Sequence, residues 1–428
     1  MRDTGRVPER MSVFDLAELA ADVGPNPRTI GVLLELDGPA LDLATVRATL
    51  RARLGLVPRL AQCMRPVPVG AGRPVWQAVT VDLDHHVRAR TAESADLLGV
   101  TAAILAEPLD PGRPWWTLTV VDLPAARRSA LVWSSHHAMA DGPSVLRAVL
   151  AVVQEGPARA LPPPSPMPGR AGLALEAWAS RARSLRGVAR LPQALAGLRE
   201  VGASSGRRVP ASPLNRAVTA GYVLRTVEVD LDALRAGARS CGATVNDALL
   251  WAWGRALHRR LADVGLVGPV VVSCPVTVPS RAIENRVGVV RFAVPAPGDQ
   301  VAADLAALAR DTRRRKRRIT GVTWWLAAQA FRAVGALGAY RWFVERQRSI
   351  TSVLTNMRGP AEPLQVLGRG VTRAVPLATL VGNVTVTAAA LSWNGRLVVT
   401  VMCAPQAAHW ADVLAADLRD GLAQVVAL

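Results

Sequence analysis

Two adjacent histidines, His136 and His137, begin the stretch HHAMADG, which Asp141 and Gly142 complete. A neutral histidine aimed into a cleft can accept a proton from a hydroxyl, thiol or amine while that group attacks a carbonyl carbon. Because histidine ordinarily titrates near neutrality, such a base is available at physiological pH. The stretch therefore indicates general-base chemistry at one of the two imidazoles.

The same residues also have a purely structural interpretation. Asp141 is a suitable N-cap for a helix that follows it, and Pro143 is tolerated in a first helical turn. Gly142 would let the chain turn tightly. A histidine considered alone is more often a surface or core residue than a catalyst, so the residues by themselves leave both interpretations open.

Alternating strand and helix patterns surround the histidines. Apolar runs predict strands at residues 29–38, 116–123 and 130–135, and the last of these ends directly before the histidine pair. Helical spacing of leucine and valine predicts helices over 42–54 and 143–154. This alternation is typical of a mixed α/β fold, with the histidines in a turn between a buried strand and a helix.

A proline-rich segment divides the chain. Residues 155–170 read EGPARALPPPSPMPGR and predict a linker or extended crossover. An amphipathic, arginine-rich helix is expected from about residue 172 to 201. We therefore divide the chain into an N-terminal lobe (1–155), a linker with a crossover helix (156–215) and a C-terminal lobe (216–428).

Composition excludes several classes of protein. The 51 basic residues exceed the 33 acidic ones and give a net charge of +18, yet they are dispersed, so we expect no nucleic-acid partner. The four cysteines are far apart, and the six histidines show no ligand-like spacing beside them, so we expect no metal site. No uncharged apolar run is long enough to span a membrane, and the charged start is unlike a signal peptide. We expect a cytoplasmic protein, with a membrane or lipid-droplet surface as its second location.

HHAMADG matches the H-H-x-x-x-D-G motif of the coenzyme A-dependent acyltransferase superfamily, which includes the condensation domains of peptide synthetases. More narrowly, the chain resembles the bacterial wax ester synthases/acyl-CoA:diacylglycerol acyltransferases. Segments that resemble this family occur in order along nearly the whole chain: LGLVPRLAQCM, GRPVWQAVTVDLDHHVR, EPLDPGRPWWTL, SPLNRAV, GATVNDALLWAWGRALHRRL, ENRVGVVRFAVP, TNMRGP and GNVTVTAAALSWNGRLVVTV.

The resemblance implies two chloramphenicol-acetyltransferase-like lobes, each a mixed β-sheet flanked by helices, with the active site between them. It assigns the catalytic base to His137, which would deprotonate an acceptor hydroxyl that attacks the thioester of acyl-CoA. His136, Asp141 and Gly142 would shape the loop. The implied reaction forms triacylglycerol or wax esters from diacylglycerol or a long-chain alcohol, with acyl-CoA as donor substrate, no other cofactor and no covalent intermediate.

Three further residues carry over from the family as substrate-binding or structural support: Asn246, Asp247 and Trp116. Asp247 has an equally good structural interpretation, because Thr244 and Asp247 have the spacing of a helix capping box. Trp115 stands where the family has leucine, which affects local packing more than catalysis.

Other interpretations stay open. The family often has an aromatic residue soon after the aspartate that corresponds to Asp15, and this chain lacks it, so the acceptor side could differ. A specialised acyltransferase for a natural-product hydroxyl or amine is one alternative, and a non-catalytic acyl-binding or membrane-surface protein is another. The basic run Arg313–Arg318 is interpreted as a solvated helix end, with contact to anionic lipid as the second choice.

Overall fold

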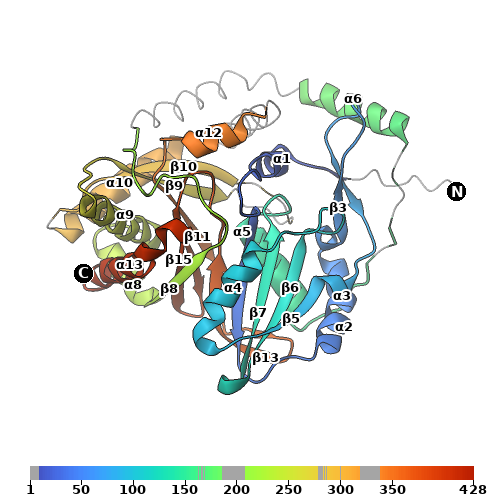
Figure 1. Cartoon of the computed structure of the whole chain (residues 1–428), viewed down its shortest axis with the longest axis horizontal. Helices are drawn as coiled ribbons and strands as arrows, with labels where there is room; N and C mark the ends of the chain where they lie inside the picture. Colours follow the sequence, from blue (N-terminus) through green and yellow to red (C-terminus); the bar gives the residue numbers. More distant parts are fainter. Residues whose placement is uncertain are drawn as a thin grey trace.

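The computed structural model describes residues 9–161, 163–164, 167, 169–185, 208–277, 283, 285, 287–298, 300–318 and 338–428. It contains two six-stranded mixed sheets, one in each lobe, and a small three-stranded sheet (Figure 1). The small sheet has the order β1 (Glu9–Arg10), β4 (Val75–Ala78), β3 (Gln62–Arg65). The two-lobed mixed α/β architecture predicted from the sequence is confirmed.

The N-terminal sheet places the histidine pair at the end of a central strand. Its strand order is β12 (Gln365–Val366), β13 (Arg369–Leu377), β2 (Thr29–Leu36), β7 (Arg128–His136), β6 (Trp116–Leu123), β5 (Val87–Thr91). All neighbours are antiparallel except β5 and β6. Helices α2 (Leu43–Arg53), α3 (Leu83–His86), α4 (Leu97–Ala106) and α5 (Gly142–Val153) accompany this sheet.

Strand β2 shows why the central strands are apolar throughout. Its alternate residues Ile30, Val32, Leu34 and Leu36 contact the core that α2 and α5 cover, whereas Leu33 faces the core on the opposite side, against α4. A strand buried on both faces must be apolar at successive positions, because its side chains alternate between the faces.

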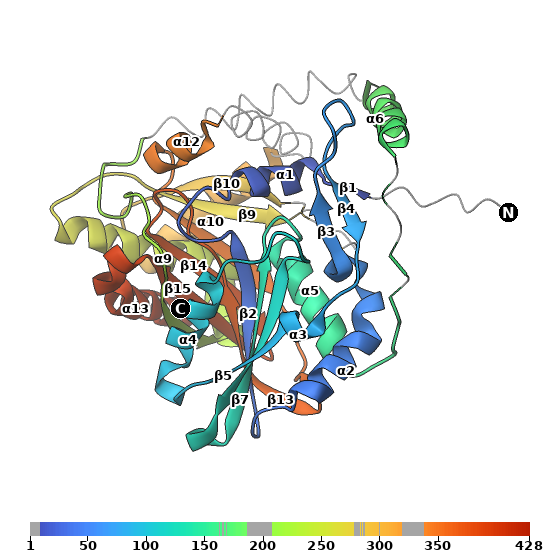
Figure 2. The same cartoon turned by 45° about the vertical axis from the view of Figure 1, so that its right-hand side comes forward.

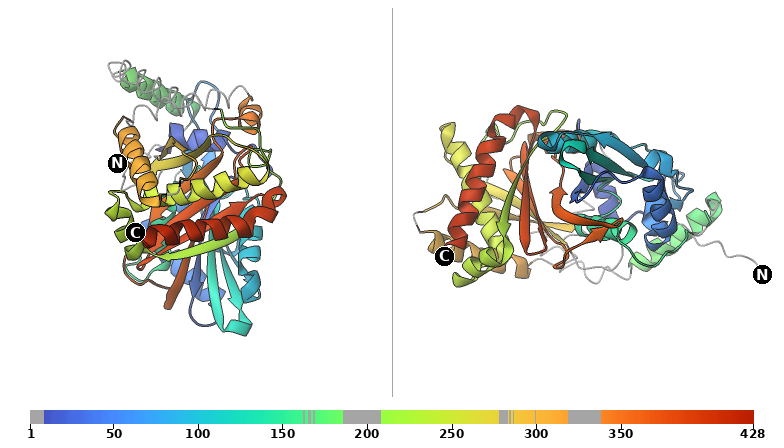
Figure 3. Two further views of the ribbon diagram at one scale, coloured as in Figure 1. Left: turned by 90° about the vertical axis from the view of Figure 1, so that its left-hand side faces the viewer. Right: turned by 90° about the horizontal axis from the view of Figure 1, so that it is seen from below.

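The C-terminal sheet has the order β10 (Val287–Val294), β9 (Val270–Thr277), β11 (Ser352–Arg358), β14 (Val386–Trp393), β15 (Arg396–Cys403), β8 (Val223–Asp230). β11 is parallel to both of its neighbours. The remaining helices are α1 (Val13–Ala20), α6 (Arg170–Leu185), α8 (Leu231–Ser240), α9 (Val245–Asp263), α10 (Val301–Arg318), α12 (Tyr340–Arg346) and α13 (Ala411–Val426). Viewed from below, α8, α9 and α13 cover the outer face of this sheet (Figure 3).

One segment of the second half of the chain, β12 and β13, belongs to the sheet of the N-terminal lobe. Strands β12 and β13 lie within residues 216–428, yet β13 pairs with β2 of the N-terminal sheet, from Val371 opposite Leu36 to Leu377 opposite Gly31. The predicted C-terminal lobe (216–428) therefore contributes two strands to the N-terminal sheet. The predicted crossover helix corresponds to α6, and its remainder, from residue 186, lies outside the described residues.

Candidate active site

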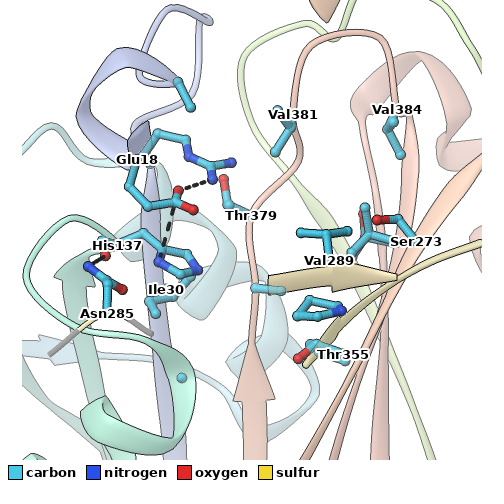
Figure 4. Close-up of a pocket in the computed structure, with 18 of the residues that line it drawn as sticks. Glu18, Ile30, His137, Ser273, Asn285, Val289, Thr355, Thr379, Val381 and Val384 are labelled. Atoms are coloured by element: carbon cyan, nitrogen blue, oxygen red, sulfur yellow. Dashed lines mark hydrogen bonds and ion pairs between the residues drawn. The ribbon is translucent and has the colours of Figure 1, made fainter. Parts of the chain in front are cut away.

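A cavity of about 460 Å³ lies between the two lobes. The N-terminal lobe lines it with α1, the start of β2, His137 and the start of α5, and the C-terminal lobe lines it with β9, β10, β11, β14 and α12. Figure 4 shows Glu18 and His137 on one side and Ser273 and Val289 on the other. Most of its lining side chains are apolar, among them Ile30, Val289, Val381 and Val384. A largely apolar cavity of this size with a few polar groups is typical of a small-molecule site.

The register of β2 and β7 brings His137 to the cavity wall. The two strands are antiparallel with Thr29 opposite His136, so the next pair outward is Arg28 and His137. The amide of His137 donates a hydrogen bond to the carbonyl oxygen of Arg28 at 2.7 Å. The ring of His137 therefore leaves the end of the sheet beside the cavity (Figure 4).

The two ring nitrogens of His137 have different surroundings. Nδ1 is buried, accepts or donates no hydrogen bond, and lies 4.0 Å from Oε2 of Glu18. The side chain is 18% exposed and lines the cavity, and in Figure 4 its second nitrogen, Nε2, points away from Glu18 toward the space between the lobes. Nε2 is therefore the atom that a substrate in the cavity reaches.

Helix α1 supplies the carboxylate next to that ring. Ser12 and Asp15 form a capping box that fixes the start of the helix. Helical spacing then turns Phe14, Glu18 and Ala21 toward the cavity. No pattern in the sequence points to Glu18, although this stretch lacks the aromatic residue that the family often has after the aspartate corresponding to Asp15.

Glu18, which is partly exposed, forms an ion pair with the buried Arg28. Burial raises the pKa of Glu18, but the charges of Arg28 and His137 and the hydrogen bond from Arg28 outweigh burial and lower the pKa to about 2. Burial lowers the pKa of Arg28, and the charge of Glu18 more than restores it, so that it is raised. Both groups are consequently ionised throughout the physiological range, at the edge of an apolar cavity.

His136 is held in one tautomer by its neighbours. Its Nδ1 accepts a hydrogen bond from the amide of Ala138 at 3.0 Å, so Nε2 carries the proton and donates to Asp22 at 3.2 Å. Its ring also contacts Trp115, with centroids 4.9 Å apart. These contacts connect the histidine loop to the segment that follows α1 and to Trp115.

Asn285 connects the C-terminal lobe to the histidine loop. Its side-chain amide donates to the carbonyl oxygen of His137 at 2.8 Å and to the carboxylate of Asp15 at 3.2 Å, and the residue is 2% exposed. It lies in the ENRVGVV segment that resembles the family, but no pattern in the sequence points to this residue. Its partner His137 is 148 residues away.

Asp141 and Gly142 shape the start of α5, and the reason for Gly142 differs from the expected one. Asp141 caps the helix, accepting from the amide of Ser144 at 2.9 Å. The φ angle of Gly142 is not positive, so no tight turn requires glycine at this position. A Cβ on Gly142 would instead lie 2.6 Å from Sδ of Met357 in β11, so glycine permits close approach of the two lobes.

The remaining predicted site residues lie away from the described lining of the cavity. Asn246 and Asp247 start α9, where Asp247 completes the capping box with Thr244 and also accepts from Thr312 Oγ1 at 2.6 Å. Trp116 is buried in β6, where its ring stacks against Trp133 and its Nε1 donates to a backbone carbonyl. These observations favour structural roles for Asp247 and Trp116. Asn246 lies in the first turn of α9 and does not line the cavity.

The basic run is seen in part, at the end of α10. Arg314 and Arg315 pair with Asp311, and Arg313 donates to the carbonyl of Gly242 at 2.6 Å. The side chains of residues 316–318 and the tryptophan-rich residues 319–337 lie outside the described residues. Within the described part of the chain, no group of three or more potential ligands is arranged for a metal ion. In that same part, no helix combines the length and apolar character needed to span a bilayer.

Two family profiles match the chain in succession. The wax ester synthase/diacylglycerol acyltransferase catalytic domain matches residues 11–249, and the C-terminal domain of the same family matches residues 283–425. A probable diacylglycerol O-acyltransferase of Mycobacterium tuberculosis is 26% identical, with 93% of this chain and 91% of that protein aligned. A putative diacylglycerol O-acyltransferase of the same species is 27% identical over 71% of this chain and 66% of its own length, just under two thirds.

Solved structures share the fold. The wax ester synthase/diacylglycerol acyltransferase from Marinobacter aquaeolei superimposes with a TM-score of 0.67 at 20% identity, covering 98% of this chain and all of that one. The starter condensation domain of rhizomide synthetase, in complex with C8-CoA, gives a TM-score of 0.66 at 14% identity, covering 99% of this chain and 95% of the other.

Proposed function

Because the chain belongs to the wax ester synthase/diacylglycerol acyltransferase family, we propose that it transfers a fatty acyl group from acyl-CoA to the hydroxyl of diacylglycerol or a long-chain alcohol. The observation that carries the proposal is the placement of His137. Its Nε2 faces an apolar cavity between the lobes, large enough for a small-molecule substrate. The apolar wall of this cavity is compatible with both an acyl chain and an apolar acceptor.

The reaction needs one base and no added redox or metal chemistry. The acceptor oxygen attacks the thioester carbonyl carbon and forms the new C–O bond, while its proton passes to Nε2 of His137. When the C–S bond breaks, the departing sulfur takes that proton and leaves as coenzyme A. The thioester of acyl-CoA is already activated, so we propose no further cofactor.

A direct transfer is favoured over an acyl-enzyme. Ser134 and Ser135, the serines next to the histidines, are buried in β7 and do not line the cavity. Cys274 is buried in β9 and is likewise outside the lining. A nucleophile must reach the thioester carbon and be activated by a base. Two serines, Ser273 and Ser349, line the cavity, but among the described residues neither is hydrogen-bonded to His137, and Ser349 donates to Gln347.

A second acceptor class is supported by the charged groups of the wall. Glu18, Arg28 and Arg291 all line the cavity, and desolvating charge against a wholly apolar acceptor costs free energy. An acceptor with polar groups beside its nucleophile, such as a natural-product hydroxyl or amine, would recover part of that cost. The fold shared with peptide-synthetase condensation domains is consistent with this alternative.

We also propose that one face of the protein contacts a membrane or lipid-droplet surface. Trp342 in α12 is 62% exposed beside Phe343, which lines the cavity, and Trp178 in α6 is 66% exposed. Both helices lie on the side of the molecule that carries α1 (Figure 2). Exposed tryptophans with nearby arginines are typical of contact with an anionic lipid interface. Flotation with anionic vesicles tests this, and unchanged flotation of Trp342→Ser/Trp178→Ser would contradict it.

The acceptor assay tests the proposed function. Purified protein receives palmitoyl-CoA with diacylglycerol, hexadecanol, a set of polar alcohols and amines, or no acceptor, and released coenzyme A and acylated product are measured. Neutral lipid product supports the main proposal. Turnover with polar acceptors alone supports the second class. Acyl-CoA binding without turnover on any acceptor would contradict an enzymatic function.

A further inference from the structure

Glu18 occupies an unusual place for a charged residue. Its carboxylate stands at the boundary of an apolar cavity, on a helix face that otherwise presents Phe14, Ala17 and Ala21. The side chain is 24% exposed, and its partner Arg28 is 10% exposed. Nε and Nη1 of Arg28 are buried without hydrogen-bond partners, so the ion pair does not recover the full cost of burying the guanidinium. Stability alone is therefore a poor explanation for this pair.

The position of the pair relative to His137 suggests its use. Oε2 of Glu18 is 4.0 Å from Nδ1 of His137, and Nδ1 is buried with no other partner. The histidine can act as a base only if its lone pair is on Nε2, which requires the proton on Nδ1. A carboxylate facing Nδ1 favours that tautomer, because it attracts the N–H and repels a lone pair.

We propose that Glu18 is a positioning residue that keeps His137 in its Nδ1–H tautomer and stabilises the imidazolium formed when Nε2 takes the acceptor's proton. Arg28 keeps Glu18 ionised and aimed at the ring. The separation of 4.0 Å is longer than a hydrogen bond, and catalytic hydrogen bonds often shorten only when substrate is bound. The inference rests on the proposed role of His137 as the base.

Charged and titratable groups face the ring of His137 from α1, from α12 and from the cavity wall. Burial raises the pKa values of Glu18 and Asp22 on the α1 side, but their ion pairs and hydrogen bonds outweigh burial and lower both. Burial raises the pKa of Tyr340 in α12 to about 12, and Arg28 and Arg291 stay cationic at neutral pH.

The test replaces the pair and keeps the fold. Glu18→Met/Arg28→Met exchanges a buried ion pair for apolar side chains, a change that is often neutral or stabilising. Arg260→Met/Asp417→Met is the matched control, because those two residues form a similarly shielded ion pair between α9 and α13, away from the cavity. The single variant Glu18→Gln removes the charge while retaining a hydrogen-bond acceptor.

We expect kcat to fall 10- to 100-fold in Glu18→Met/Arg28→Met, with KM for acyl-CoA changed less than threefold and melting temperature at or near the wild-type value. The acid limb of the pH–rate profile should move to lower pH, because the imidazolium loses its carboxylate. Glu18→Gln should shift the limb in the same direction, and the control pair should change neither kcat nor the profile.

Histidine-selective ¹⁵N NMR gives a readout that is independent of turnover. The wild type should show His137 protonated on Nδ1, assigned by loss of its signals in His137→Gln, and Glu18→Met/Arg28→Met should shift the equilibrium toward Nε2–H. An unchanged tautomer and unchanged pH profile would overturn the inference, even if kcat falls. If the wild type turns over no acceptor, the proposed function fails, and the NMR titration still tests the coupling of Glu18 to His137.

Discussion

Replacing Asn285 tests whether the C-terminal lobe holds the catalytic loop in place. The amide of Asn285 makes one hydrogen bond to the His137 carbonyl and one to the Asp15 carboxylate, both buried. A neutral hydrogen bond is worth about 1 kcal/mol and one to a charged group about 1.5–3 kcal/mol, so Asn285→Ala should lower the free energy of unfolding by about 2–4 kcal/mol. Asp15 keeps its contacts with Trp76 and Ser12, so the larger local change falls on the loop of His137.

The same substitution should reduce activity through the position of the ring. A shift of about 1 Å in a reacting group can cost on the order of 100-fold in rate, so we expect kcat to fall 10- to 100-fold with KM for acyl-CoA nearly unchanged. Steady-state kinetics and thermal unfolding on the same preparations measure both effects.

Asn26→Ala is the matched control. Asn26 is also buried, its amide donates to the carbonyl of Thr219 at 3.0 Å, and its Oδ1 accepts from the amide of Gly221 at 2.7 Å. It should lose comparable stability and keep its kcat within threefold. Equal losses of kcat in the two variants would refute the reasoning, because general destabilisation would then account for the effect of Asn285.

Three further predictions concern stability. Because the folded-state pKa of Glu18 is depressed to about 2, its ionisation stabilises the fold above pH 4.5, and this contribution disappears as the pH falls toward 2. The free energy of unfolding of Glu18→Met/Arg28→Met should therefore depend less on pH than that of the wild type over this range. Gly31→Ala should abolish soluble folded protein, judged by circular dichroism, because its Cβ would lie 1.8 Å from the carbonyl oxygen of Trp133; a folded variant with unchanged melting temperature would contradict this close approach. Asp247→Ala should lower the melting temperature, since it removes a capping box and a buried hydrogen bond, and should leave kcat/KM within threefold; a selective loss of kcat/KM would return Asp247 to the site.

Local patterns predicted the elements that carry the histidine loop. The apolar runs at β2, β6 and β7 are strands, and the buried face of α5 follows the spacing of its leucines and valines. The capping residues Asp141 and Asp247 were also predictable, because a cap involves residues only three positions apart.

Contacts between distant segments were not predictable from this one sequence. Glu18 meets His137 only because α1 lies over the end of the β2–β7 pair, and Asn285 reaches the same loop from the other lobe. The pairing of β13 with β2 joins segments more than 300 residues apart, which no local periodicity encodes. Gly142 begins α5 without a positive φ, so the tight turn predicted for it is wrong, and its contact with Met357 of the opposite lobe is another contact between distant segments.

A single-turnover measurement with His137→Gln most directly tests the role of His137 as the base. Enzyme in excess over radiolabelled palmitoyl-CoA is mixed with the best acceptor, and product formation and intact protein mass are followed together. We expect acyl transfer to slow by at least about 100-fold relative to wild type, with no acylated protein at any time, as a direct transfer through this base requires. Transfer within tenfold of the wild-type rate, or an acyl adduct that forms and decays at the rate of turnover, would contradict the central claim.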